Sequence, residues 1–139
     1  LLIFNSHGGN VGVMDVAARQ IRAQHGMAVW HSSWFNLPLA AATQALFSAD
    51  EQRFGIHAGQ IETALMLAIA PHLVNKSQAQ HFASSSQTRA QKWPLLGDGR
   101  SAKLGWQMQD YNAAGAVGNA AAATGRCRSR SAAEVAAVT

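Results

Sequence analysis

The sequence opens with Leu1-Leu2-Ile3-Phe4-Asn5-Ser6-His7-Gly8-Gly9-Asn10, an apolar run that ends in a polar, glycine-rich loop. Because its apolar residues do not alternate with polar ones, the run is typical of a strand buried on both faces in a parallel sheet. Asn10 is a favourable helix N-cap, and apolar residues then recur at helical spacing as far as His25, before Gly26. We therefore expect a strand, a glycine loop and a helix of about four turns.

The next apolar run, Met27 to Trp30, is the expected second strand. The order strand, helix, strand favours a right-handed crossover and a parallel α/β sheet. Ligands bind at the carboxyl ends of the strands in such sheets, so we expect a binding site near His7, with backbone N–H groups of Gly8 and Gly9 around it. Trp34 follows the second strand at the same edge, where it is either a pocket wall or an ordinary core aromatic.

A second histidine lies in His57-Ala58-Gly59-Gln60-Ile61-Glu62-Thr63, just before an apolar helix that Pro71 ends. His57 and Glu62 are five residues apart and do not share a face of one continuous helix. They can converge if His57 lies in a loop broken at Gly59 and Glu62 lies in the first helical turn, where a carboxylate suits the helix dipole. An ionised carboxylate in a buried setting needs a cation or a partner, so chemistry or an ion is expected here. The alternative is that Glu62 only caps the helix and His57 packs at its entrance.

Other segments carry weaker signals. Residues 36–53 are expected to include a short helix, with Asp50-Glu51 as its solvated start, and the apolar helix 64–70 is expected to be buried. The polar composition of residues 75–101 predicts a long surface loop. The alternation in residues 104–108 predicts a strand.

The composition limits the class of protein. A chain of 139 residues is one domain at most or part of a larger one, and 48% hydrophobic residues argue against global disorder. The net charge of +4 is concentrated in Arg126, Arg128 and Arg130, so nucleic-acid binding by the body of the domain is not expected. The single cysteine, Cys127, cannot form an intrachain disulfide, which fits a reducing compartment. No apolar stretch reaches about 18 residues, so no membrane-spanning helix is expected.

Three separated blocks resemble the creatininase (creatinine amidohydrolase) family. Residues 5–10 are similar to the family's Asn-Gly-His-Gly-Gly-Asn, and residues 57–63 to its His-Ala-Gly-Glu-x-Glu-Thr. The third block is Gly105-Trp106-Gln107 with Asp110, followed by Gly115-x-x-Gly118-Asn119. The likeness runs from residue 1 to about 124, and the chain is expected to start after the family's N-terminal Glu-x-His-Gly-x-His-Leu-Pro block, which supplies most of the metal ligands.

The resemblance implies an α/β protein with a three-layer fold and a mainly parallel central sheet, incomplete here at the N-terminus. Residues 1–124 would form the partial creatininase-like domain, and residues 125–139 a divergent Arg/Ser/Ala-rich tail that is expected to be poorly ordered. It also implies homo-oligomers, which are hexamers in many members. A cytoplasmic location, with no nucleic-acid or membrane partner, is expected from the cysteine count, the charge and the hydropathy.

The resemblance further implies hydrolysis of a C–N bond in a small-molecule cyclic or formyl amide. Two divalent ions (zinc, manganese or iron) would activate the attacking water in the complete protein. The implied roles are metal binding for His7 and Glu62, proton transfer to the leaving nitrogen for His57, and substrate binding for Trp34, Gly8 and Gly9. One histidine and one carboxylate cannot complete the coordination of two ions. The alternative is therefore a non-catalytic or inactive fragment with the same fold.

Overall fold

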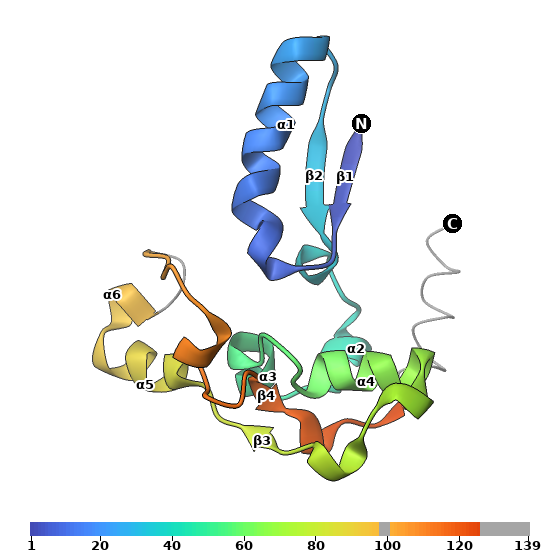
Figure 1. The fold of residues 1–139 in the computed structure, drawn as a ribbon, viewed down its shortest axis with the longest axis vertical. Coiled ribbons are helices and arrows are strands. Elements are labelled where there is room, and N and C mark those ends of the chain that lie inside the picture. Colours follow the sequence, from blue (N-terminus) through green and yellow to red (C-terminus); the bar gives the residue numbers. More distant parts are fainter. Residues whose placement is uncertain (98–100, 126–139) are drawn as a thin grey trace. The chain divides into compact units, whose positions relative to one another are not determined.

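A computed structural model describes residues 1–97 and 101–125 (Figure 1). By its internal contacts the chain divides into two units, Leu1–Ala40 and Ala41–Thr139. Each unit is described below by itself. Apart from Gly125, the tail predicted at residues 125–139 lies outside the described residues.

The first unit follows the predicted order of strand, glycine loop, helix and strand. Its elements are β1 (Leu2–Asn5), the 3₁₀ turn η1 (Gly8–Asn10), α1 (Val11–His25), β2 (Trp30–Ser33) and the 3₁₀ turn η2 (Trp34–Asn36). β1 and β2 pair in parallel, from Leu2 opposite Trp30 to Asn5 opposite Ser33. The helix α1 lies along this pair (Figure 1) and buries Met14 and Ala18.

Two predictions for this unit need correction. The second strand begins at Trp30 instead of Met27, because Gly26 ends α1 in a left-handed conformation and residues 27–29 return the chain to the start of β1. The first strand is not buried on both faces, since Leu2 and Phe4 are 61% and 59% exposed. In the part of the chain that is described, β1 belongs to a sheet of two strands with a helix on one face.

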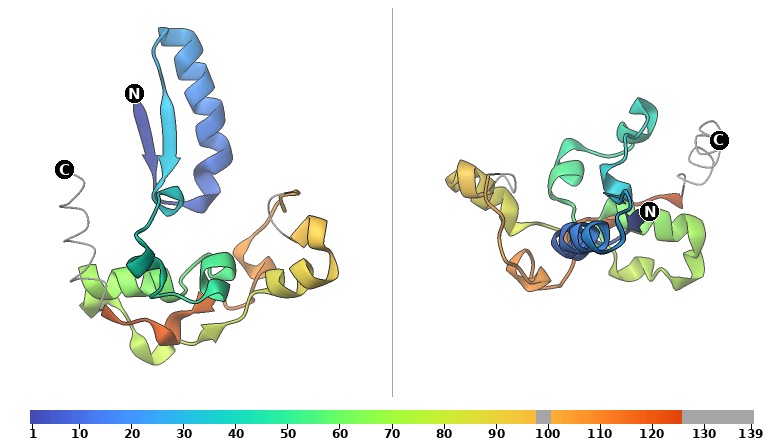
Figure 2. Two further views of the ribbon diagram at one scale, coloured as in Figure 1. Left: turned by 180° about the vertical axis from the view of Figure 1, so that it is seen from behind. Right: turned by 90° about the horizontal axis from the view of Figure 1, so that it is seen from above.

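Within residues 41–97 and 101–125, the second unit consists of short helices and one small sheet. Its elements are α2 (Ala41–Gln44), α3 (Ala49–Phe54), α4 (Gln60–Ile69), η3 (Pro71–Leu73), η4 (Lys76–Gln78), β3 (His81–Phe82), α5 (Ser85–Lys92), α6 (Pro94–Gly97), η5 (Met108–Asp110), β4 (Gly118–Asn119) and η6 (Ala120–Ala122). β3 and β4 pair antiparallel. The 3₁₀ turn η6 packs beside α4, as the red-orange and green ribbons of Figure 2 show. Ala64 and Leu67 of α4 join Val117 and Ala120 in the core.

Three further predictions for this unit are wrong. Residues 75–101 are not a long loop, because Ser84 caps the N-terminus of α5 by accepting a hydrogen bond from Ser86 N–H, and a polar helix follows. Residues 104–108 do not form a strand and lead into η5 instead. The helix α4 is not buried all round, since Ile69 is 77% exposed. The short helix predicted within residues 36–53 is confirmed by α2 and α3.

The fold is therefore α/β, with one small parallel sheet and one small antiparallel sheet. Within residues 1–97 and 101–125 no sheet exceeds two strands, so the three-layer arrangement with a mainly parallel central sheet stays a prediction. None of the helices in these ranges is both long and apolar enough to cross a bilayer.

Candidate functional site

The second unit places His57 in a strained turn at the entrance of α4. Ala58 has a φ of 52°, in the left-handed region that alanine rarely adopts. Gly59 is the N-cap of α4, and the helix begins at Gln60. Such backbone conformations cost free energy and persist where the surrounding structure enforces them, often at functional sites.

The turn brings His57 and Glu62 together. The His57 Nδ1 atom lies 3.6 Å from Glu62 Oε2, and both side chains are nearly half exposed. The same Oε2 atom accepts a hydrogen bond of 2.7 Å from the Ala58 backbone N–H, which holds the carboxylate against the turn. The convergence that the sequence allowed is therefore present, with His57 before the helix and Glu62 in its first turn, where Glu62 also accepts a backbone N–H at the helix start, as the capping alternative expected. The side chains remain open to a small molecule.

His57 is anchored to the C-terminal part of the unit by its backbone. Its carbonyl accepts a 2.7 Å hydrogen bond from Val117 N–H, and its own N–H donates to the Val117 carbonyl at 3.4 Å. Val117 is fully buried. Residues 115–119, a glycine-spaced block in the sequence, therefore hold the turn through the backbone of Val117.

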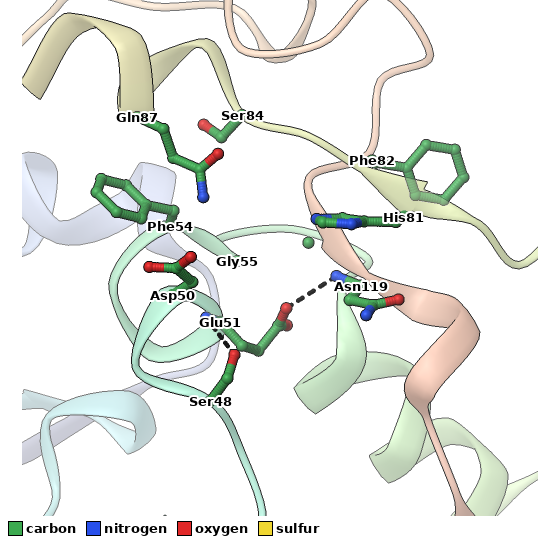
Figure 3. Close-up of a pocket in the computed structure, with 11 residues that line it drawn as sticks. Ser48, Asp50, Glu51, Phe54, Gly55, His81, Phe82, Ser84, Gln87 and Asn119 are labelled. Atoms are coloured by element: carbon green, nitrogen blue, oxygen red, sulfur yellow. Dashed lines mark hydrogen bonds between the residues drawn. The ribbon is translucent and has the colours of Figure 1, made fainter. Parts of the chain in front are cut away.

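A buried carboxylate that the sequence reasoning misplaced lies under this turn. Asp50-Glu51 was predicted to be a solvated helix start, but only Asp50 is exposed, and Glu51 is 4% exposed. The Glu51 Oε1 atom accepts hydrogen bonds from the backbone N–H groups of Gln60 (2.6 Å) and Ile61 (3.4 Å). The Oε2 atom accepts from the Asn119 N–H at 2.8 Å (Figure 3).

One local signal could have located Glu51. Ser48 and Glu51 have the Ser-x-x-Glu spacing of a capping box, in which the glutamate would turn back to its own helix start. Ser48 Oγ does accept the Glu51 N–H at 3.1 Å. The Glu51 side chain does not turn back to its own helix start. It accepts a hydrogen bond from the backbone N–H of Gln60 at the N-terminus of another helix, α4. That redirection depends on tertiary contacts that sequence spacing does not encode.

A small cavity of about 120 Å³ adjoins Glu51. Ser48, Phe54, His81, Ser84 and Asn119 contribute to its wall (Figure 3). Neither His57 nor Glu62 lines it. The cavity therefore lies beside Glu51 and is separate from the His57–Glu62 pair.

The first unit holds the other predicted site residues. His7, Gly8 and Gly9 follow the carboxyl end of β1, and Trp34 follows that of β2, as predicted for a parallel pair. The buried Asn5 organises the loop: its amide nitrogen donates to the His7 carbonyl at 2.7 Å, and its amide oxygen accepts the His7 N–H at 3.1 Å. His7 itself is exposed. The metal-binding role of His7 and the substrate-binding roles of Gly8, Gly9 and Trp34 stay predictions.

The residues that each unit brings together do not complete a metal site. In the described ranges, no group of three or more His, Cys, Asp or Glu side chains could hold a metal ion. The His57–Glu62 pair offers one imidazole and one carboxylate, and both oxygens of Glu51 already accept backbone hydrogen bonds. Three or more protein ligands are usual for catalytic zinc. The metal roles of His7 and Glu62 therefore remain predictions.

The comparison with known families agrees with the three sequence blocks. The family model described as creatinine amidohydrolase (Creatininase) matches residues 1–135, which include parts of both units. The chain therefore belongs to the creatinine amidohydrolase family, whose members are generally metal-dependent. No curated protein and no solved structure matches the chain.

Proposed function

We propose that this protein hydrolyses the C–N bond of a small-molecule amide, with His57 and Glu62 acting together in proton transfer. Membership of an amidohydrolase family supports the reaction class. The observation that carries the assignment is the 3.6 Å approach of His57 Nδ1 to Glu62 Oε2 on a turn with a left-handed alanine.

The geometry gives the two side chains different tasks. A carboxylate next to Nδ1 favours the tautomer with the proton on that nitrogen, which leaves Nε2 to exchange a proton with the substrate. As an imidazolium, His57 then gives its proton to the leaving nitrogen, as a general acid. The Ala58 N–H keeps the Oε2 atom of Glu62 in place. A separation of 3.6 Å is longer than a hydrogen bond, and pairs of this kind commonly tighten when substrate binds.

The finer assignments follow the family resemblance. The proposed substrate is a cyclic or formyl amide, with Trp34 and the backbone of Gly8 and Gly9 as binding groups. A pair of divalent ions would supply an activated water. The proton-transfer step above uses only groups of this chain. A cytoplasmic location and homo-oligomeric assembly belong to the same proposal.

Amide hydrolysis by the full chain tests the assignment. Release of formate or of a ring-opened acid is followed on an N-formyl amine and on a five-membered cyclic amide, with zinc or manganese added. His57→Gln is expected to lower kcat about 100-fold or more, the usual contribution of a general acid. His72→Gln, a change of an exposed histidine in η3, is the matched control and should keep the parent activity. Parent and His57→Gln proteins with equal rates, or a parent without hydrolysis, would favour a non-catalytic member of the family.

A further inference from the structure

We propose that Glu51 is a positioning residue for the His57–Glu62 pair, a role that rests on the proposed function of that pair. Glu51 does not contact the His57 or Glu62 side chains through any of its hydrogen bonds. Its carboxylate instead joins the start of α4 to β4. The turn that carries His57 comes directly before the first of these attachments in the chain.

The carboxylate bridges segments that are distant in sequence. One oxygen accepts the N–H groups of Gln60 and Ile61, which have no partner inside their own helix because they belong to its first turn. The other oxygen accepts the N–H of Asn119. A buried ionised group is tolerated only when hydrogen bonds replace its water, and these three donors do so.

Three glycines shape the space around the carboxylate. A Cβ atom built on Gly55 or on Gly59 would overlap the Glu51 carboxyl group. On Gly118, whose φ of +124° already disfavours a side chain, a Cβ would lie 2.9 Å from both carboxylate oxygens. These positions therefore leave room for the carboxylate and bring the backbone N–H groups close to it.

The attachments of Glu51 are adjacent to the groups that hold the pair. Gln60 comes two residues after Ala58, whose N–H holds Glu62 Oε2. Asn119 comes two residues after Val117, which exchanges two backbone hydrogen bonds with His57. Loss of the carboxylate would free both ends of this arrangement, so His57 and Glu62 would no longer be held in one geometry.

The chemistry of the group can be tested with a substitution of nearly the same shape. A glutamine at position 51 keeps one acceptor oxygen but presents an NH₂ group to a backbone N–H donor. At least one of the three backbone donors then loses its partner. A charge-assisted hydrogen bond contributes enough for its loss to accelerate local opening about tenfold or more.

The experiment is amide hydrogen exchange of the ¹⁵N-labelled full chain, read residue by residue by NMR. In Glu51→Gln we expect exchange to quicken about tenfold or more at Gln60 or at Asn119, whichever faces the new NH₂ group, and exchange at Ala58 to quicken with it. The imidazole ¹⁵N signals of His57 should shift in the same variant. Asp50→Asn changes the exposed acid next to Glu51 in the same helical turn and should alter none of these signals.

Two results would overturn the proposal. If Gln60 or Asn119 exchanges faster while Ala58 and the His57 imidazole keep their parent signals, Glu51 only holds its own hydrogen-bond partners and does not position the pair. If none of the four signals changes, the carboxylate does not hold these amides. Should Glu51→Gln fail to fold, Glu51→Asp decides by the same criteria, because it keeps the charge and shortens the reach by one methylene. The exchange data do not depend on turnover, so a failed hydrolysis assay would count against the proposed function alone.

Discussion

His57 and Val117 exchange two backbone hydrogen bonds, so the turn that carries the candidate proton donor is attached to a segment 60 positions later in the chain. The shorter bond, from Val117 N–H to the His57 carbonyl, is 2.7 Å. Val117 has no exposed surface. The geometry of the pair therefore depends on how residues 115–119 pack as well as on the local turn.

Gly118→Ala should strongly destabilise the second unit. The new Cβ would lie 2.7 Å from Gly59 Cα and 2.9 Å from the Glu51 oxygens, in addition to the strain at a φ of +124°. Backbone strain and overpacking together are expected to lower the free energy of unfolding by about 2–4 kcal/mol. Urea denaturation followed by circular dichroism measures it.

Gly115→Ala is the matched control for that substitution. Gly115 also has a positive φ, of 74°, but a Cβ there meets nothing within 4 Å. Its replacement should lower the free energy of unfolding by only about 1 kcal/mol, the backbone term alone. Equal losses in the two variants would mean that the packing of Gly118 against Gly59 and Glu51 does not matter.

Gly12→Ala should stabilise the first unit. Gly12 lies in α1, and a Cβ there meets no other atom within 4 Å. Alanine reduces the conformational entropy of the unfolded chain and suits a helix, so a gain of about 0.5–1 kcal/mol is expected in thermal unfolding. Gly26→Ala at the end of the same helix should act in the opposite direction, because Gly26 has a φ of 63°. A loss of stability in Gly12→Ala would contradict the helical position of Gly12.

Asp15 should give the first unit a small, salt-sensitive dependence on acid. The hydrogen bond from Arg19 Nε, at 3.1 Å, is the main cause that holds the pKa of Asp15 below its ordinary value of 3.8, and the nearby His31 adds to it. A lowered pKa in the folded state means that the contribution is complete above pH 3.8 and is lost as the pH falls through the folded-state pKa. Both side chains of the Arg19–Asp15 pair are at least half exposed, so salt should weaken the effect.

Arg19→Gln tests this account directly. A ¹³C carboxyl NMR titration should show the pKa of Asp15 rising towards 3.8 in the variant. Gln20→Ala, a change of an exposed neighbour in α1, should leave the titration as it is. An unchanged curve in Arg19→Gln would show that another group sets the pKa.

Local sequence patterns were enough to predict features that are formed by residues close together in the sequence. The apolar run before His7, the helical spacing after Asn10 and Gly26 predicted the strand, loop and helix of the first unit, although the Asn10 side chain donates to Asn5 and makes no capping hydrogen bond. The glycine between His57 and Glu62 allowed the two side chains to approach, since the convergence needs only one turn.

Tertiary contacts decided the features that were mispredicted. Glu51 was expected to be solvated because acidic residues at a helix start usually are. Its hydrogen-bond donors instead belong to α4 and to β4, where Asn119 is 68 positions away in the sequence. The helix α5 has no apolar face that periodicity could detect, and Ser84 starts it through a local cap. Residues 104–108 alternate, but alternation produces a strand only where a neighbouring strand offers a partner.

His57 and Glu62 are proposed to act as one unit in amide hydrolysis, and a double-mutant cycle on kcat measures whether they do. His57→Gln, Glu62→Gln and the double variant are compared with the parent chain on the same amide. If Glu62 acts through His57, the double variant should be about as slow as His57→Gln alone, because groups that work together are not additive. Losses that multiply in the double variant would contradict the account and would assign Glu62 a separate role.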